Sequence, residues 1–227
     1  MVMKPEILYF DNHLVVIAKP AGMLVQGDAT GDETLLEYAR QFVREEFNKP
    51  GKVYMGLVHR LDRPASGVVC FAKTSKAAAR LSKQFQQKTI TKKYLALVEG
   101  EVPVSGHLID NLERRDRNSF VAKNGKKAEL TFQRVAFQDN VSLVDVNLKT
   151  GRHHQIRVQF AHRGHGILGD FRYGSTIKFP NQTIGLHAYS LTLNHPTQKE
   201  AMTFTAPPPE NWPNYFIQQA TEFTNEK

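Results

Sequence analysis

Asp62 is the residue of this sequence that stands where a side chain could do chemistry. It lies between Arg60 and Arg63, after the apolar run 56–58 and before a turn at 64–67. A strand end that enters a loop is a common place for a catalytic side chain, because the rigid strand aims it into a cleft. An Asp between two Arg residues is nevertheless more often a structural ion pair. These residues alone leave both roles open.

A catalytic carboxylate in a secluded pocket must stay ionised at neutral pH. Full burial can raise the pKa of a carboxyl group by roughly 3–5 units, which corresponds to about 4–7 kcal/mol. One cation about 4 Å away, at an effective dielectric constant near 20, returns roughly 4 kcal/mol. A single well-placed Arg could therefore keep Asp62 charged as a nucleophile or base.

The nine histidines raise the question of a metal site. His153, His154, His162 and His165 lie close together, but zinc sites usually use i, i+4 His pairs with a carboxylate, or pairs of Cys. The chain has a single cysteine, Cys70, which is expected to be a buried core thiol. We therefore expect solvated or phosphate-facing histidines and no metal. The sequence also lacks a GxGxxG motif and a P-loop, so we expect no nucleotide cofactor.

Hydrophobic periodicity places the elements that would position these residues. The first helix is expected to begin at a capping box, Thr34 to Glu37, and the second at Thr74 or Ser75. A third helix is expected over 152–163, and the tail beyond Trp212 is expected to be partly helical. Strands are expected over these ranges: 7–10, 14–18, 68–72, 94–98, 128–135, 141–148, 184–193 and 202–206.

Strands and helices do not alternate regularly along the chain. This order favours an α+β fold with a central, largely antiparallel mixed β-sheet flanked by helices and loops, rather than a doubly wound parallel sheet. The 227 residues suffice for one substantial core. We expect a single catalytic domain over 1–227, with its core at about 7–207 and a tail at 208–227.

The charge balance favours a polyanionic partner. Thirty Lys and Arg side chains against 22 Asp and Glu give a net charge of +8, and each phosphate bound by such a cation releases counterions. The basic segment 114–127 is usually a solvated loop in such a protein, or it could track phosphates. The N-terminus lacks the apolar region of a signal peptide and no long apolar segment follows, so we expect a cytoplasmic protein without a membrane span.

Four motifs, in order along the chain, resemble the RluA-type pseudouridine synthases. His59-Arg60-Leu61-Asp62 with Ser66-Gly67 looks like the family signature around its catalytic Asp. The other three are similar to the family's N-terminal turn, tyrosine strand and C-terminal motif: Lys19-Pro20-Ala21-Gly22, Lys92-Lys93-Tyr94-Leu95-Ala96-Leu97-Val98 and Thr150-Gly151-Arg152-His153-His154-Gln155-Ile156-Arg157-Val158. The resemblance runs from about Ile7 to Pro207. It looks closest to the TruC-like, tRNA-directed branch and implies the pseudouridine synthase fold.

The resemblance implies a role for each matched residue. Asp62 would be the catalytic carboxylate, Tyr94 would pack on the target base, and Arg157 would pair with the catalytic Asp. Arg60 would help to displace the target base from its stack, and Leu186 would close the base pocket. Purely structural alternatives remain for three of them: Tyr94 could be a core tyrosine, Arg157 a surface arginine and Leu186 a core leucine. Residues expected to contact the RNA are these: Arg63, Arg114, Arg115, Lys126, Lys127 and Arg152.

The expected helix 152–163 gives Arg157 a specific place. Ile156 and Phe160, four residues apart, would face inward, and Arg157 would lie at the edge of that face. The residue Gln159 departs from the family pattern, in which a His is common, and Ala65 replaces a frequent Thr. Gly166 replaces a common Pro.

The reaction implied by the resemblance breaks the N1–C1′ bond of a uridine in structured rRNA or tRNA, turns the base and joins C5 to C1′. It needs no cofactor, and Asp62 would either attack C1′ or remove the C2′ proton. The base must first leave its stack, which costs a few kcal/mol and is cheapest in a loop or bulge. We expect a monomer without a separate N-terminal RNA-binding module.

Two other functions would fit parts of the sequence. A catalytically silent RNA-binding module would be free to lose Asp62 and Tyr94, which are both present. An N-glycoside hydrolase usually needs two carboxylates about 5–10 Å apart. Asp170 is the best candidate for the second carboxylate, and it is expected to be structural.

Overall fold

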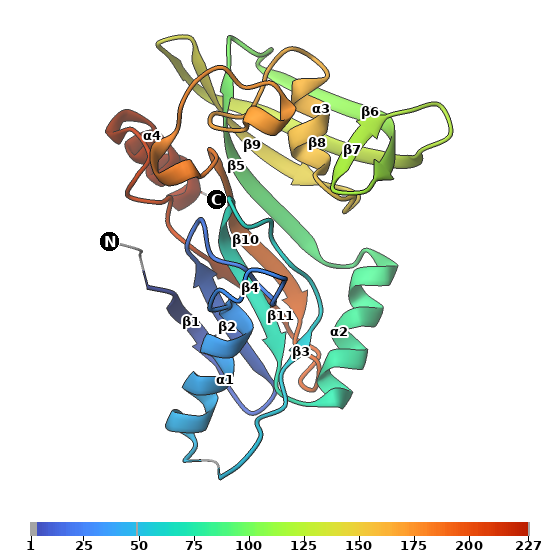
Figure 1. Ribbon diagram of the computed structural model, residues 1–227, viewed down its shortest axis with the longest axis vertical. Helices are drawn as coiled ribbons and strands as arrows, with labels where there is room; N and C mark the ends of the chain where they lie inside the picture. The colour runs from blue at the N-terminus through green and yellow to red at the C-terminus, as the bar shows by residue number, and fades with distance from the viewer. Residues whose placement is uncertain (1–3, 49, 227) are drawn as a thin grey trace. The chain divides into compact units, whose positions relative to one another are not determined.

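The computed structural model describes residues 4–48 and 50–226, and the chain divides by its contacts into two compact units (Figure 1). The first unit consists of Met1–Ile90 and Tyr189–Ala206, and the second consists of Thr91–Ala188 and Pro207–Lys227. The strand β10 begins in the second unit and ends in the first. That residues 1–227 act as a single domain stays a prediction.

In the first unit, strands follow the order β1-β2-β4-β10, with β3 paired to β4 and β11 paired to β10. The pairs β1–β2, β2–β4, β3–β4 and β10–β11 are antiparallel. The elements have these bounds: β1 (Glu6–Phe10), β2 (Leu14–Lys19), α1 (Leu35–Glu46), β3 (Gly56–Leu57), β4 (Ser66–Ala72), α2 (Ser75–Gln87), β10 (Leu186–Asn194) and β11 (Ala201–Thr205).

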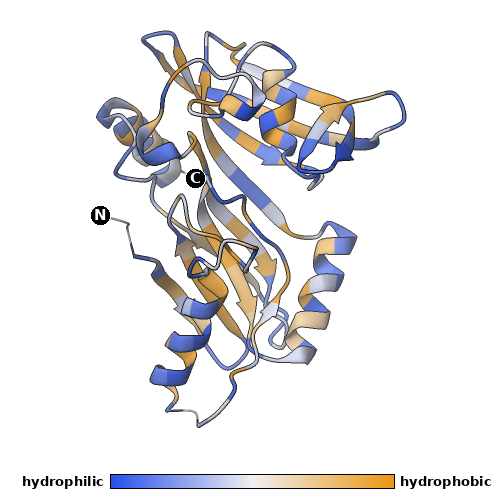
Figure 2. Cartoon of the chain, viewed as in Figure 1, coloured by the Kyte–Doolittle hydropathy of each residue, from blue (hydrophilic) through white to orange (hydrophobic). Residues whose placement is uncertain are grey.

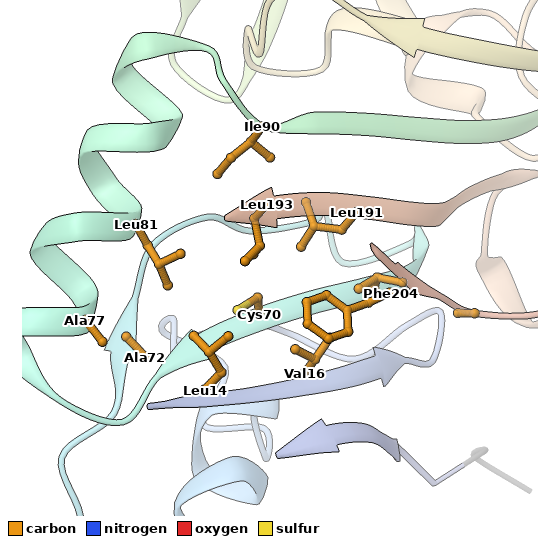
Figure 3. Close-up of a cluster of buried hydrophobic side chains, with 12 residues drawn as sticks. Leu14, Val16, Cys70, Ala72, Ala77, Leu81, Ile90, Leu191, Leu193 and Phe204 are labelled. Carbon is orange, nitrogen blue, oxygen red and sulfur yellow. The ribbon is translucent and has the colours of Figure 1, made fainter. Parts of the chain in front are cut away.

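The sheet of the first unit is buried on both faces. Alternate residues of a strand point to opposite sides, and successive residues of β2 and β4 are buried. Leu14 and Val16 of β2 and Cys70 of β4 pack in one cluster with Leu81 of α2 and Phe204 of β11 (Figure 3). The intervening residues of β2 and β4 are equally buried and point toward the side of α1, which contacts β2. Figure 2 shows both strands as hydrophobic over most of their length. Burial raises the pKa of the Cys70 thiol to about 12, and the predicted core thiol is confirmed.

Two helices begin where the sequence predicts. The Glu37 N–H donates to Thr34 Oγ1 at 3.2 Å, and the Thr34 N–H donates to the Glu37 carboxylate at 3.0 Å, which completes the capping box of α1. Thr74 caps α2 by accepting from the Ala77 N–H at 3.1 Å. Each such cap stabilises a helix end by about 1 kcal/mol.

In the second unit, strands follow the order β5-β9-β8-β6-β7, and the pairs in this series are antiparallel. The helix α3 packs on β6 and β7, where Val158 joins a cluster with Leu112 and Ala128, and α4 packs on β8. The elements have these bounds: β5 (Thr91–Glu99), β6 (Ser105–Arg115), β7 (Asn118–Val121), β8 (Lys126–Gln138), β9 (Val141–Leu148), α3 (Gln155–Ala161), η1 (Phe171–Tyr173), η2 (Pro180–Gln182) and α4 (Asn214–Asn225).

The α+β class with a largely antiparallel sheet is confirmed, and two local expectations are wrong. The basic segment 114–127 is not one loop, because β6 continues to Arg115 and β7 follows within two residues. The buried residues Leu108 and Leu112 of β6 are separated by mostly exposed ones. This apolar pattern is short, and the many charged residues after it hide the strand in the sequence. The third helix begins at Gln155 rather than at 152, because His154 has a φ of 55° and leaves the helical path.

Candidate active site

Asp62 lies on the loop 58–65 between β3 and β4 (the Asp62 loop). The Ala65 N–H donates to the Asp62 carbonyl at 3.2 Å, which closes a turn around Arg63 and Pro64. The Asp62 side chain is half-buried, and that of Arg60 is exposed. The turn therefore presents a partly secluded carboxylate beside an exposed guanidinium.

His59 anchors the start of the Asp62 loop. The Cys70 N–H of β4 donates to His59 Nε2 at 2.9 Å, and the imidazole stacks on Phe85 of α2 with the ring centroids 5.0 Å apart. Because Nε2 accepts a hydrogen bond, the neutral ring carries its proton on Nδ1. His59 thus fixes the loop to a strand and a helix, a structural role that the motif alone did not reveal.

Lys19 ties the Asp62 loop to the turn that follows β2. Its Nζ donates to the carbonyls of Pro20 at 2.9 Å, Met23 at 2.8 Å and Arg63 at 3.2 Å. The side chain is only 2% exposed. This burial lowers the pKa of Lys19 to about 7, although the nearby charge of Asp62 raises it. The sequence shows a Lys just before a Pro-Ala-Gly turn, but it does not show that this Lys bonds to the Asp62 loop.

The Arg63 side chain folds back on the same turn. Its Nε donates to the Gly22 carbonyl at 3.0 Å, and its Nη2 pairs with Asp32 at 2.7 Å. In return, the Gly22 N–H donates to the Arg63 carbonyl at 2.8 Å. Gly22 has a φ of 88°, a conformation that favours glycine. The Arg63 guanidinium joins loop and turn, and its contact with RNA stays a prediction.

Arg157 is buried in the second unit, so the alternative of a surface arginine is wrong. The residue is 4% exposed, in a helix whose residues 155–160 are all buried. Its Nε and Nη2 donate to the two carboxylate oxygens of Asp170 at 2.6 and 2.8 Å. The ring of Tyr173 lies 5.0 Å from the guanidinium carbon. Asp170 therefore has the structural role predicted for it, and pairing of Arg157 with Asp62 stays a prediction.

Tyr94 lies half-buried on β5, opposite Val146 of β9. Lys92, two residues earlier, points to the same side of the strand. Desolvation lowers the pKa of Lys92, and a Cβ at Gly151 would lie 2.9 Å from its Nζ. Gly151 thus leaves room for this amine beside the loop that leads into α3. The Lys-x-Tyr spacing on a strand is the signal that could have singled out Lys92.

Leu186 begins β10 and is 5% exposed. The preceding Gly185 approaches β5 so closely that a Cβ there would lie 2.9 Å from the Cβ of Leu97. The Leu97 N–H donates to the Gly185 carbonyl at 2.8 Å. The core alternative fits this packing, and the role of Leu186 in closing a base pocket stays a prediction.

A chain of side-chain hydrogen bonds holds α3. Thr150 Oγ1 donates to Gln155 Oε1 at 2.7 Å, and Gln155 Nε2 donates to Gln159 Oε1 at 3.0 Å. Gln159 Nε2 then donates to Asp110 Oδ2 at 2.7 Å, which also accepts from Arg163 at 2.9 Å. Burial acts to raise the pKa of Asp110, but these hydrogen bonds lower it overall. The amide of Gln159, the residue that departs from the family pattern, both accepts and donates within this chain.

The clustered histidines make internal contacts. The rings of His153 and His154 stack with their centroids 3.7 Å apart. Their Nδ1 atoms bond to Ser119 Oγ at 2.9 Å and to Tyr173 Oη at 2.6 Å, respectively. His165 bonds to a backbone carbonyl. Of the four, only His162 is exposed and the others are part-buried, and that they face phosphate stays a prediction. The network fastens β7 and η1 to the start of α3.

The residues expected to contact RNA phosphates are exposed along β6, β8 and the loop before α3. Several of them have intramolecular partners: Arg114 Nε donates to the Asp116 carbonyl, Arg115 pairs with Glu113, Lys127 pairs with Glu129, and Arg152 Nε donates to the Lys127 carbonyl. Such surface contacts are worth little and exchange readily for phosphate. Their contacts with RNA stay predictions, as does that of Lys126.

Within residues 4–48 and 50–226, no three His, Cys, Asp or Glu side chains gather as they would around a metal ion. No helix in the same part of the chain is long and apolar enough to cross a membrane.

Comparison with known proteins gives consistent results. The family model described as RNA pseudouridylate synthase matches residues 13–162. The chain is 36% identical to the ribosomal large subunit pseudouridine synthase C of Buchnera aphidicola over 92% of this chain and 69% of that protein. It is 33% identical to the tRNA pseudouridine synthase C of Haemophilus ducreyi over 98% of this chain and 99% of that protein. Asp62, Tyr94, Arg157 and Arg60 lie within the segment that the family model matches, and Leu186 lies outside it.

A solved structure shows the same fold. The human RNA pseudouridylate synthase domain containing 4 superposes with a TM-score of 0.76, at 22% identity, over 95% of this chain and 91% of the human chain.

Proposed function

This chain belongs to the RNA pseudouridylate synthase family, and we propose that it converts a specific uridine of a structured rRNA or tRNA to pseudouridine with Asp62 as the catalytic carboxylate. The observation that carries the proposal is the family match over 13–162, which contains the whole Asp62 loop. The reaction is an isomerisation, so atoms and electrons balance within the RNA itself. The N1–C1′ bond breaks and a C5–C1′ bond forms, while C5 loses a proton and N1 gains one.

The Asp62 loop is built to hold a carboxylate steady. His59 fixes the start of the loop, and Lys19 binds the backbone carbonyl of Arg63, the residue after Asp62. A group held in a near-attack geometry loses little entropy at the reaction step. Asp62 would then either attack C1′ or remove the C2′ proton to give a glycal, and both routes regenerate the carboxylate.

Tyr94 and Arg157 are proposed to serve the same nucleotide. The flipped uracil would stack on the half-buried Tyr94 ring, because aromatic faces hold extruded bases. Arg157 would pair with the Asp62 carboxylate, while Asp170 fixes the plane of the guanidinium. Arg60 would help to displace the base, and Leu186 would close the pocket around it.

Asp62→Asn tests the proposal directly. We expect the variant to form no detectable pseudouridine in total cellular RNA, while its RNA affinity stays within about twofold of the wild type. Asp32→Asn is the matched control, because Asp32 is an exposed partner of Arg63 outside the turn. Pseudouridine formation by Asp62→Asn at near wild-type rate would exclude Asp62 from the chemistry.

The RNA target requires a second measurement. Pseudouridines would be mapped across total RNA from cells with and without this chain, and a site lost from rRNA or from tRNA names the target class. The mass of the RNA must stay unchanged. Release of free uracil would instead indicate an N-glycoside hydrolase.

A further inference from the structure

The 3-10 turn η1 presents the aromatic ring of Phe171 to solvent. Phe171 is 59% exposed, more than Tyr54 at 50%, Phe120 at 46% or any other large aromatic side chain in the described part of the chain. It directly follows Asp170, the residue that holds the guanidinium of Arg157. A lone exposed apolar side chain is common and needs no explanation, so the surroundings of the ring decide its meaning.

The turn that carries Phe171 is fixed on both sides. On one side, Asp170 is buried and bound to Arg157. On the other, Tyr173 Oη accepts from the Ser119 N–H of β7 at 2.9 Å and bonds to His154 at 2.6 Å. The exposed ring therefore stands on a rigid base, and a ligand that stacks on it would order few additional bonds.

The charges around this turn suit a polyanion. Arg172, next to Phe171, donates from Nη1 to the Arg117 carbonyl at 3.0 Å, which joins η1 to the turn between β6 and β7. Arg114 lies opposite Ser119 in the β6–β7 register. The side chains of Arg114, Arg117 and Arg172 are all exposed. An exposed aromatic ring among arginines is the combination that binds unpaired nucleotides, through stacking and phosphate contacts.

We propose that Phe171 is a stacking platform for an unpaired base that flanks the target uridine, with Arg172 and Arg117 contacting the adjoining phosphates. The inference rests on the proposed function, since it assumes that the target nucleotide is bound at Arg157. It adds a substrate class: the nucleotide next to the target is unpaired, because a base inside a continuous duplex has no free face for the ring.

Binding of two probes tests the platform: a fluorescein-labelled 12-nucleotide oligouridylate, and the same strand annealed to oligoadenylate. We expect Phe171→Ala to weaken binding of the single strand about 5- to 150-fold, which is the effect of one lost stacking contact. The salt dependence of binding stays unchanged, because no charge is removed. Arg172→Ala should instead make the slope of log affinity against log salt concentration shallower by about 0.7, because one phosphate contact is lost.

Phe137→Ala is the matched control. Phe137 is also an exposed Phe of the second unit, but it lies opposite Ser142 at the other end of β8 from Lys126. It should bind oligouridylate as the wild type does. Phe171→Trp should keep the affinity and show quenching of the new indole by RNA, against the background of the buried Trp212.

Wild-type affinity of Phe171→Ala for the single strand would overturn the platform, and so would equal binding of single strand and duplex by the wild type. Either result with intact pseudouridine formation leaves the proposed function standing. A wild-type enzyme that forms no pseudouridine would overturn the proposed function, whatever oligouridylate does.

Discussion

At the scale of single residues, two buried ionisable side chains support the groups proposed to act on RNA. Lys19 holds the Asp62 loop, and Asp170 holds Arg157. A buried charge is costly unless its hydrogen bonds are satisfied, and both residues make several. Each is therefore expected to respond strongly when its charge or its partner changes.

The Lys19 amine gives a pH dependence of stability. Its pKa is about 7 in the folded chain and near 10.4 when unfolded. Between these values the unfolded state binds a proton that the folded state has released, so the free energy of unfolding rises with pH. We expect the wild type to gain about 3 kcal/mol relative to Lys19→Met between pH 7 and 9.5. Urea unfolding of both proteins at the two pH values measures this, and parallel pH curves would contradict it.

Asp170→Asn removes the charge of the carboxylate that accepts from Nε and Nη2 of the buried Arg157 guanidinium. We expect a loss of about 3–5 kcal/mol in the free energy of unfolding. The control is Glu101→Gln, because Glu101 is an exposed partner of Arg134, and its loss should be about 1 kcal/mol or less. Denaturant titration compares the two variants. Equal losses would mean that the Arg157–Asp170 pair is no stronger than a partly exposed one.

At the scale of elements, α3 depends on polar packing as well as on apolar contacts. The helix has only seven residues, too few to be stable alone, so its position comes from its contacts. Val158 packs on the sheet, and Gln155 and Gln159 join the helix to Thr150 and Asp110 through buried hydrogen bonds. A change in this chain should therefore reach Arg157 through the helix that carries it.

Gln159→Leu removes both hydrogen bonds of the buried amide at nearly constant volume. We expect a loss of about 1–3 kcal/mol in the free energy of unfolding and a lower rate of pseudouridine formation at unchanged RNA affinity. Gln159→Glu should cost more, because its carboxylate would face Asp110. Gln133→Leu, at an exposed position of β8, is the control. Wild-type stability of Gln159→Leu would show that the chain does not hold α3.

At the scale of the whole molecule, the net charge of +8 governs the encounter with RNA. Affinity should fall steeply with salt, with a slope of about −0.7 for each phosphate contacted on a single strand. The double variant Arg114→Ala/Lys126→Ala should make the slope shallower by about 1–2. Lys83 is exposed on α2, and Lys83→Ala should leave the slope unchanged. Fluorescence anisotropy between 50 and 300 mM salt measures these slopes, roughly the range over which counterion release dominates. A flat profile would exclude the basic surface as the RNA footprint.

Local chemistry determined much of this protein from its sequence. Capping residues set the starts of α1 and α2, and long apolar runs set β2 and β4, because these signals act within a few residues of the chain. The candidate roles of Asp62, Tyr94 and Arg157 came instead from the resemblance of their motifs to a known family. Only the tertiary structure decided that Lys19 clamps the loop, that Asp170 holds Arg157 and that Gln159 bonds Asp110. These partners lie up to 49 residues apart in the chain. Which polar side chains meet therefore depends on tertiary packing, because a polar group that is buried without a hydrogen-bond partner destabilises the fold.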